Sequence, residues 1–195
     1  MEPLPVTGLV LAGGASRRMG RNKAFLELRG RYLIDIVIER VAIVCSEVLV
    51  VTGDSSPYAG MGVPVVEDRF RGVGVLGGIH AGLEAAAHEL ALVVACDMPF
   101  LQPDLMRAFV DWAEGYDAVV FRKGEYVEPL HAVYRASCLP AIEQAIRSGE
   151  RRIVSFFSKT NVSFITPEDV KPFDPELRSF SNVNTPEEWA AVHSE

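Results

Sequence analysis

The sequence predicts an α/β protein with three layers, in which helices cover both faces of one mostly parallel, Rossmann-like sheet. Short, almost wholly apolar runs, such as "LALVVAC" at residues 90–96, are typical of strands buried on both faces. These runs alternate with segments whose apolar residues recur at helical spacing, as Ile34, Val37 and Val41 do. The 195 residues, 49% of them apolar, suffice for one sizeable core, so we expect residues 1–195 to form a single domain.

Seven runs have the length and the apolar character of strands. In chain order they are residues 8–13, 48–54, 63–68, 90–99, 117–121, 128–135 and 162–169. Glycine, proline and acidic residues end several of them, as in "VTGD" and "CDMP", which is usual where a strand gives way to a loop.

Helices are predicted between these strands. Their ranges are residues 33–44, 79–88, 103–115 and 139–147, followed by a short helix from residue 153 and a last one near the C-terminus. Pro103 suits a first helical turn and Gly115 a helix end, while Thr185 and Pro186 suit the start of the last helix. The glycine-rich segment of residues 70–78 is predicted to be a loop.

The charge distribution favours a small anionic ligand. The net charge is −7, so the broad basic surface that nucleic-acid binding requires is not expected. Against this acidic background, four basic residues gather in one short segment, namely Arg17, Arg18, Arg21 and Lys23. We therefore expect no nucleic-acid partner and a local site for an anion.

Cysteine usage and hydropathy point to the cytoplasm. Cys45, Cys96 and Cys138 lie far apart and form no CxxC pair, so we expect buried, reduced thiols. The N-terminus lacks the features of a signal peptide, and no apolar stretch approaches the ~18 residues of a membrane span. The sequence thus predicts a cytoplasmic protein that makes no membrane contact.

The segment "LVLAGGASRRMGRNKAFLEL", residues 9–28, has the composition of a phosphate-binding loop. It fits neither the GxxxxGK[ST] pattern of a P-loop nor the GxGxxG pattern of a dinucleotide site. Gly13 and Gly14 can adopt positive φ and let successive backbone N–H groups face an anion. Arg17 can clamp phosphate oxygens, and Lys23 adds a compact charge. The alternative is an ordinary solvated surface loop.

Two acidic residues are predicted to lie beside this loop. Asp68 and Asp97 each follow a predicted strand, and the loop follows the first strand. Carboxyl ends of parallel strands share one edge of a sheet, where ligands of such folds bind. The alternatives are that Asp97 only ends a strand and that Asp68 forms a surface ion pair with its neighbour Arg69.

Several motifs together resemble one enzyme family. Residues 11–23, "LAGGASRRMGRNK", match the loose signature LAGGxSxRMGxxK of nucleotidyltransferases with a glycosyltransferase-A-like sheet. "CDMPF" at residues 96–100 and "NVNTPEE" at residues 182–188 are more specific. With "VVED", "GVLGGIHAGL" and "EPLHAVY", they are similar to the molybdenum cofactor guanylyltransferase family. The blocks run in order from Leu11 to Glu188, over nearly the whole chain.

The resemblance implies a fold of the nucleotide-diphospho-sugar transferase type and a specific reaction. Members transfer GMP from GTP to the phosphate of the molybdenum-molybdopterin cofactor, use Mg²⁺, and release pyrophosphate. The resemblance also implies transient contacts with molybdoenzymes or their chaperones. Carried over by position, the residues that bind substrate or metal would be Leu11, Ala12, Gly13, Gly14, Lys23, Asp68, Asp97, Asn182 and Asn184.

The resemblance also assigns roles within this set. Lys23 would contact the triphosphate, Asp68 the nucleoside, and Asp97 the magnesium ion. Asn182 and Asn184 would lie on the pterin side of the cleft, although asparagine also suits turns and helix caps.

The implied chemistry needs these residue types. The attacking phosphate oxygen is already ionised at neutral pH, so the reaction requires no general base. Catalysis then depends on positioning and on spreading negative charge, for which Lys23, Arg17 and Asp97 are the candidate catalytic residues. Because Mg²⁺ takes one or two carboxylates together with phosphate oxygens, Asp97 suffices as the protein's metal ligand.

Three positions depart from the family's pattern. Val75 replaces the proline of the usual GPLGG, and Tyr32 replaces the proline of the usual GKPL. A polar residue is common at the end of the second strand, which falls at Thr52 and Gly53 here; if Gly53 is the matching position, recognition of the base there would use the backbone.

Three alternative functions stay open. A molybdopterin cytidylyltransferase would share the loop, the metal-binding acid and the fold. Another nucleotidyltransferase would act on a different phosphorylated metabolite. A non-catalytic nucleotide-binding partner is the third alternative, and the presence of both Lys23 and Asp97 argues against it.

Overall fold

The computed structural model describes residues 2–12, 22–70 and 72–182. They form a seven-stranded sheet in the order β5-β4-β1-β6-β8-β7-β9 and a separate two-stranded sheet, β2-β3. β1 is parallel to β4 and β6, β4 is parallel to β5, and β7 is parallel to β9. Because only β8 runs antiparallel to its neighbours in the described sheet, the prediction of a mostly parallel α/β fold is confirmed.

The elements follow one another in the predicted order. The strands are β1 (Leu4–Leu11), β2 (Glu27–Leu28), β3 (Arg31–Tyr32), β4 (Cys45–Thr52), β5 (Val65–Glu67), β6 (Leu90–Ala95), β7 (Ala118–Lys123), β8 (Tyr126–Arg135) and β9 (Val162–Ile165). The α-helices are α1 (Leu33–Ala42), α2 (Val75–Ala85), α3 (Pro103–Asp111), α4 (Leu139–Arg147) and α5 (Pro167–Val170). Short 3₁₀ helices are η2 (Lys23–Phe25), η3 (Ser56–Tyr58), η4 (Ala136–Cys138), η5 (Ile153–Lys159) and η6 (Arg178–Phe180).

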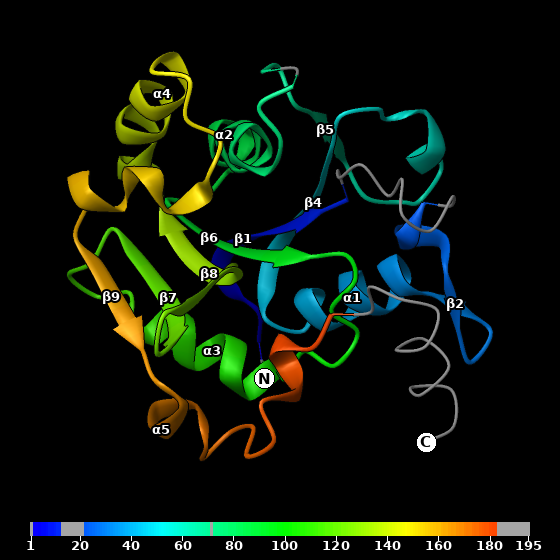
Figure 1. Ribbon diagram of the computed structural model, residues 1–195. Coiled ribbons are helices and arrows are strands. Elements are labelled where there is room, and N and C mark those ends of the chain that lie inside the picture. Colours follow the sequence, from blue (N-terminus) through cyan, green and yellow to red (C-terminus); the bar gives the residue numbers. More distant parts are fainter. Residues whose placement is uncertain (1, 13–21, 71, 183–195) are drawn as a thin grey trace.

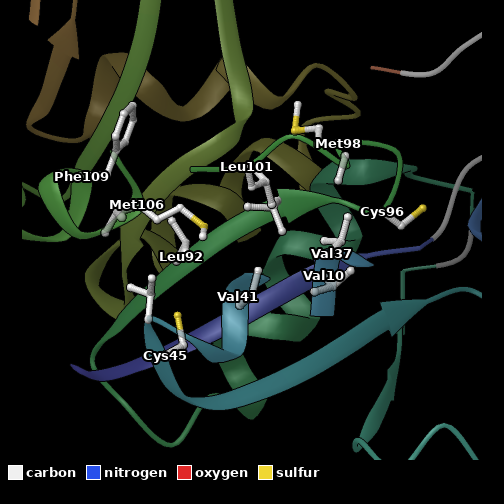
Figure 2. Packing of buried hydrophobic residues seen from close by; sticks show 14 of the residues in the cluster. Val10, Val37, Val41, Cys45, Leu92, Cys96, Met98, Leu101, Met106 and Phe109 are labelled. Carbon is white, nitrogen blue, oxygen red and sulfur yellow. The ribbon is translucent and has the colours of Figure 1, made fainter. Parts of the chain in front are cut away.

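Helices cover both faces of the large sheet (Figure 1). α1 and α3 pack on one face, and α2 and α4 pack on the other. Figure 2 shows the first of these layers, where Val10 and Leu92 of the sheet share one cluster with Val37, Val41 and Phe109 of the helices. The three predicted layers are therefore present.

Two glycines let helices approach β1 closely from opposite faces. A Cβ atom on Gly8 of β1 would lie 2.1 Å from Cγ1 of Val41 in α1. A Cβ atom on Gly82 of α2 would lie 2.6 Å from Cδ1 of Leu9 in β1. Since a side chain at either position would force its neighbours to shift, glycine allows α1 and α2 to pack directly on the central strand.

The segment of residues 70–78, predicted to be a loop, contains the first turn of α2. Gly74 has φ 79°, and its carbonyl accepts N–H bonds from Gly77 at 3.1 Å and Gly78 at 3.3 Å. α2 therefore begins four residues earlier than predicted. Adjacent glycines have low helix propensity, and the packing of this turn against the Asp68 side chain overrides it.

Three strands are shorter than predicted: β5 spans Val65–Glu67 within the predicted residues 63–68, and β6 and β9 end early. β9 ends at Ile165 because Thr166 begins a helix, its N–H and hydroxyl donating to the Asp169 carboxylate at 2.8 and 2.7 Å. β6 ends at Ala95, whose carbonyl accepts an N–H bond from Met98 at 3.3 Å, so the chain turns there. At the ends of β6 and β9, local hydrogen bonds turn the chain away from the sheet.

The hairpin of β2 and β3 is an element that the sequence pattern missed. Its two-residue turn contains Arg29 at φ 52° and Gly30 at φ 77°, as hairpin turns with positive φ at both positions require. The predicted C-terminal helix, with Thr185 and Pro186, lies outside the described residues.

The three cysteines are free and buried, as predicted. Burial raises the pKa of Cys45, Cys96 and Cys138 to about 12 in each case. Across the three described ranges, none of the helices has the length and apolar character needed to cross a membrane.

Candidate active site

Four parallel strands end at the same edge of the sheet. Leu11 of β1 lies opposite Val51 of β4 and Ala95 of β6, and Thr52 of β4 lies opposite Glu67 of β5. The segments that follow these strands therefore share one edge, which is the usual ligand site of open α/β sheets.

The first residues of the glycine loop are anchored at this edge. The Ala12 N–H donates to the Val51 carbonyl at 2.8 Å, and the Leu11 carbonyl accepts from the Cys96 N–H at 3.1 Å. The Ala12 carbonyl also accepts a hydrogen bond of 2.8 Å from the Tyr58 hydroxyl. Further predicted loop residues, namely Gly13, Gly14 and Arg17, lie outside the described residues.

Lys23 and Asp97 form an ion pair where the loop returns to the sheet. Nζ of Lys23 lies 3.3 Å from Oδ2 of Asp97, and the two side chains are 21% and 14% exposed. The Asn22 side-chain oxygen accepts the Ala24 N–H at 3.1 Å and thereby caps η2, the short helix that carries Lys23. The fold thus brings together two predicted site residues that are 74 positions apart and leaves both open to solvent.

Asp68 follows β5 and lies against the first turn of α2. Its N–H donates to the Thr52 carbonyl at 2.9 Å, and its Oδ1 accepts from the Phe70 N–H at 2.7 Å. Burial raises the pKa of this carboxyl, while the Phe70 hydrogen bond and the nearby His80 oppose the shift. A Cβ atom on Gly77 would lie only 2.6 Å from Oδ2 of Asp68, so glycine at that position makes room for the acid.

The charged neighbours of Asp68 have other partners. Arg69 lies 3.2 Å from Glu84, and Glu67 accepts the Ser55 N–H at 3.1 Å. The ion pair considered for Asp68 therefore forms between Arg69 and Glu84 instead.

Two histidines near the strands belong to the core. His80 is 4% exposed, and its Nε2 lies 3.3 Å from Oε1 of Glu143. His131 of β8 is fully buried, and its ring stacks on Phe109 at 5.1 Å between centroids. Burial lowers the pKa of His131 to about 4, so its ring is neutral at neutral pH. His131 is thus a strand residue of the core, as its alternation with apolar neighbours predicts.

Two further positions were predicted to contact ligand. The side-chain oxygen of Asn182 is buried and has no hydrogen-bond partner within the described ranges. Such an oxygen is costly until a donor pairs with it. At the end of β4, a Cβ atom on Gly53 would meet no atom of the described residues within 4 Å, so this position is open with respect to that part of the chain. The other predicted asparagine, Asn184, lies outside the described residues.

The donor set at the edge fits a magnesium ion that arrives with a phosphate ligand. In the part of the chain that the structure describes, no group of three or more His, Cys, Asp or Glu side chains could hold a metal. Mg²⁺ needs no such cage, because it binds through one or two carboxylates, phosphate oxygens and water. Asp97 offers one partly exposed carboxylate in that position.

A basic pocket of about 490 Å³ lies along α1, outside this edge. Its lining includes four arginines, namely Arg29, Arg31, Arg40 and Arg178. Arg31 pairs with Glu39, and the guanidinium of Arg178 lies 4.7 Å from the centroid of the Phe100 ring. Part of the positive charge is therefore already engaged, and the pocket is separate from the carboxylates of the candidate site.

Tyr58 is the residue of this site that sequence reasoning missed. In the segment "SSPYAG", Tyr58 is surrounded mainly by the turn-forming types serine, proline and glycine. Its hydroxyl contacts a carbonyl 46 positions earlier, and no local spacing rule connects the two.

The fold is that of a nucleotidyltransferase-like α/β protein, and its candidate ligand site lies at the carboxyl edge of the parallel strands. Residues 8–162 match the family described as MobA-like NTP transferase domain. The chain is 40% identical to a probable molybdenum cofactor guanylyltransferase of Pelotomaculum thermopropionicum and 42% identical to a molybdenum cofactor guanylyltransferase of Desulfosudis oleivorans. These matches cover 94% of this chain and 89% and 92% of the relatives. The chain therefore belongs to the MobA-like NTP transferases and, within them, to the molybdenum cofactor guanylyltransferase family.

Solved structures agree with this assignment. Molybdopterin-guanine dinucleotide biosynthesis protein A from Archaeoglobus fulgidus superposes with a TM-score of 0.85 at 32% identity, with 97% of each chain covered. The 2-C-methyl-D-erythritol 4-phosphate cytidylyltransferase from Thermus thermophilus superposes with a TM-score of 0.72 at 21% identity and 98% coverage of each chain. This second likeness shows the nucleotidyltransferase fold alone.

Proposed function

We propose that this protein transfers GMP from GTP to the phosphate of the molybdenum-molybdopterin cofactor and releases pyrophosphate. The observation that carries the proposal is the Lys23–Asp97 pair at the edge where the glycine loop begins and Asp68 lies. Relatives of nearly the same length that are named molybdenum cofactor guanylyltransferases support the same reaction.

The proposed step is an in-line displacement at phosphorus. An oxygen of the acceptor phosphate forms a bond to the α-phosphorus of GTP, and the bond from that phosphorus to the bridging oxygen breaks. The electron pair of the broken bond leaves with pyrophosphate. Because the attacking oxygen is already ionised, the protein contributes alignment and charge stabilisation rather than a general base.

Lys23 would bind oxygens of the triphosphate. Its ammonium group lies 3.3 Å from the Asp97 carboxylate. When GTP binds, phosphate oxygens would replace this carboxylate as the partner of the ammonium group, so its charge would stay paired. Arg17, which lies outside the described residues, would add a second cation. Backbone N–H groups at the start of the loop, from Leu11, Ala12, Gly13 and Gly14, would complete the phosphate contacts.

Dependence on Mg²⁺ is part of the proposal. Asp97 would hold the ion together with oxygens of the nucleotide. When bound, the ion would neutralise charge that accumulates on the phosphates. The single, partly exposed carboxylate of Asp97 at the ligand edge supports this role.

The nucleoside is proposed to lie over the ends of β4 and β5. Asp68 would accept hydrogen bonds from it, and the open space at Gly53 leaves room for a base read by backbone groups. The selection of guanine follows the names of the relatives, which do not favour the cytidylyltransferase alternative.

The acceptor is proposed to contact Asn182 and Asn184. The buried, unpartnered oxygen of Asn182 supports this, because a pterin offers N–H donors. The three free, buried thiols suit a reducing compartment, so we place the reaction in the cytoplasm. Molybdoenzymes or their chaperones would be transient partners there.

A nucleotide panel tests the function. The purified protein is incubated with Mg²⁺ and molybdenum-molybdopterin, and pyrophosphate release is measured with GTP and with CTP. We expect release from GTP that depends on the acceptor and far exceeds release from CTP. A preference for CTP would replace the guanylyl assignment, and release from GTP without the acceptor would contradict transfer to the pterin.

A further inference from the structure

One buried hydroxyl joins the two ends of the glycine loop. The Tyr58 hydroxyl donates to the Ala12 carbonyl, the last described residue before the loop, at 2.8 Å. The same hydroxyl accepts a hydrogen bond of 3.0 Å from Nδ2 of Asn22, the first described residue after it. A phenol has one donor and accepts through its lone pairs, so a single group serves both ends.

Asn22 extends this link to Lys23. Its amide nitrogen donates to Tyr58, while its amide oxygen accepts the Ala24 N–H at 3.1 Å. The two contacts need opposite ends of the amide, so together they fix the orientation of Asn22. Because Lys23 lies between Asn22 and Ala24, the position of its backbone depends on the bond to Tyr58.

Tyr58 is held by the scaffold rather than by the loop. It lies in η3 between β4 and β5, it is 1% exposed, and its N–H donates to the Ser55 carbonyl at 3.0 Å. Its ring belongs to the core cluster on the α1 and α3 face of the sheet, and it also lies 5.3 Å from the ring of Phe25 in η2, between centroids. The turn before it is fixed by Asp54, whose Oδ1 accepts the Ser56 N–H at 3.0 Å. These contacts fix the position of the Tyr58 hydroxyl, to which both loop ends are hydrogen-bonded.

The hydroxyl can keep this role at every physiological pH. Burial raises the pKa of Tyr58, although the Asn22 hydrogen bond opposes the shift. The group therefore stays protonated and continues to donate to the Ala12 carbonyl. Ala12 is itself buried, so loss of this donor would leave a buried carbonyl oxygen with one bond fewer.

We propose that Tyr58 is a positioning residue that sets the spacing between the two ends of the glycine loop. This spacing allows the Ala12 backbone and Lys23 to contact the same triphosphate. The residue acts through Ala12 and Asn22 and does not touch the substrate. The inference rests on the proposed nucleotidyl transfer, because it assigns Tyr58 a role in binding that nucleotide. It extends that proposal, because part of the affinity for GTP would then depend on a side chain of η3, which lies outside the glycine loop.

The test compares three single variants and one double variant, which combines the changes at Tyr58 and Asn22. Tyr58→Phe keeps the ring and removes the hydroxyl, and Asn22→Asp keeps the cap of η2 but removes the amide donor. Tyr134→Phe is the matched control, because Tyr134 is also fully buried and its hydroxyl donates to the Pro129 carbonyl at 2.9 Å in another part of the core. Each protein is measured for thermal stability, for kcat and KM with GTP, and for hydrogen exchange of peptides covering residues 22–26.

We expect Tyr58→Phe and Asn22→Asp each to lower kcat/KM for GTP about tenfold, mainly through KM, and to speed exchange over residues 22–26. In the double variant, kcat/KM for GTP should be no lower than in the more impaired of the two single variants. Both changes break the same link between Tyr58 and Asn22, so their effects should not add. Tyr134→Phe should lower the melting temperature about as much as Tyr58→Phe does. It should leave kcat/KM for GTP and hydrogen exchange over residues 22–26 unchanged. The inference is overturned if Tyr58→Phe behaves as Tyr134→Phe does in kinetics and in exchange.

Hydrogen exchange separates failure of this inference from failure of the proposed function. Exchange needs no reaction, so it reports on the link even if the wild-type protein transfers no nucleotide. Unchanged exchange in Tyr58→Phe would remove the positioning role while leaving the nucleotidyltransferase assignment intact.

Discussion

At the scale of single residues, the candidate site consists of contacts between distant parts of the chain. Lys23 meets Asp97 across 74 positions, and Ala12 meets Tyr58 across 46 positions. Each contact satisfies a charge or a polar atom that is wholly or largely withdrawn from water. Substitution at these positions should therefore cost some stability, because a withdrawn polar group loses its partner, and at the proposed site it should also affect ligand binding and catalysis.

The first prediction concerns Asp97. Asp97→Asn keeps the size of the side chain and removes the charge that pairs with Lys23 and would hold Mg²⁺. We expect kcat to fall by about 10²–10³-fold, the usual effect of losing one electrostatic group in an active site. Asp111→Asn, at the exposed end of α3, makes the same charge change as a control. Near-normal turnover of Asp97→Asn would remove Asp97 from the metal site.

The second prediction concerns His131 and acid stability. Burial lowers its pKa to about 4 in the folded protein, against 6.5 for an unperturbed histidine. Between these two values the unfolded chain binds the proton and the folded chain does not, so stability falls as the pH drops from 6.5 toward 4. The shift corresponds to roughly 3 kcal/mol at its limit.

Urea unfolding of the wild type and of His131→Leu at pH 7 and pH 4.5 measures this contribution. The leucine variant should lose less stability on acidification, because it has no proton to bind there. Equal losses in the two proteins would show that other groups account for the acid sensitivity.

At the scale of elements, strand interiors follow from sequence patterns better than strand ends do. The apolar runs locate β1, β4 and β6, because a strand buried on both faces leaves little room for polar residues. The end of β6 depends on a local turn, in which the Met98 N–H donates to the Ala95 carbonyl at 3.3 Å. The predicted start of α2 was wrong, because the glycines of its first turn were interpreted as a loop, whereas Gly77 packs there against the Asp68 side chain.

This arrangement of α2 leads to the third prediction. A Cβ atom on Gly77 would lie 2.6 Å from Asp68, whereas one on Gly78 would meet its nearest neighbour at an ordinary 3.8 Å. Gly77→Ala should therefore displace the Asp68 carboxylate and raise KM for GTP about tenfold. Gly78→Ala should leave KM unchanged and stabilise the helix by up to about 1 kcal/mol. Equal KM values for the two variants would argue against a role for Asp68 in nucleotide binding.

At the scale of the whole molecule, the parallel sheet determines where the candidate site lies. Four parallel strands end at one edge of the sheet, so the segments that follow them lie together there. Helices on both faces bury the sheet, so its open edge is where a ligand can reach backbone groups (Figure 1). Ligand binding should therefore stabilise the whole fold, because it adds contacts between segments that otherwise meet only through the sheet.

The fourth prediction is a magnesium-dependent stabilisation by GTP. At a GTP concentration about 100 times Kd, the melting temperature should rise by roughly 5–10 °C. Chelation of Mg²⁺ with EDTA should remove most of the rise, and Asp97→Asn should show little of it. A full shift in the presence of EDTA would contradict the proposed role of the metal in nucleotide binding.

The sequence by itself determined the α/β class, the order of the main strands and helices, and the candidacy of Lys23, Asp68 and Asp97. These features are local, because burial on two faces, helical periodicity and strand-end acids are written in contiguous residues. Only the tertiary structure decided that β8 runs antiparallel, that Gly77 makes room for Asp68, and that Tyr58 joins Ala12 to Asn22. Each of these depends on a distance between residues far apart in the chain, and such a distance is fixed when the sheet assembles rather than by any local pattern.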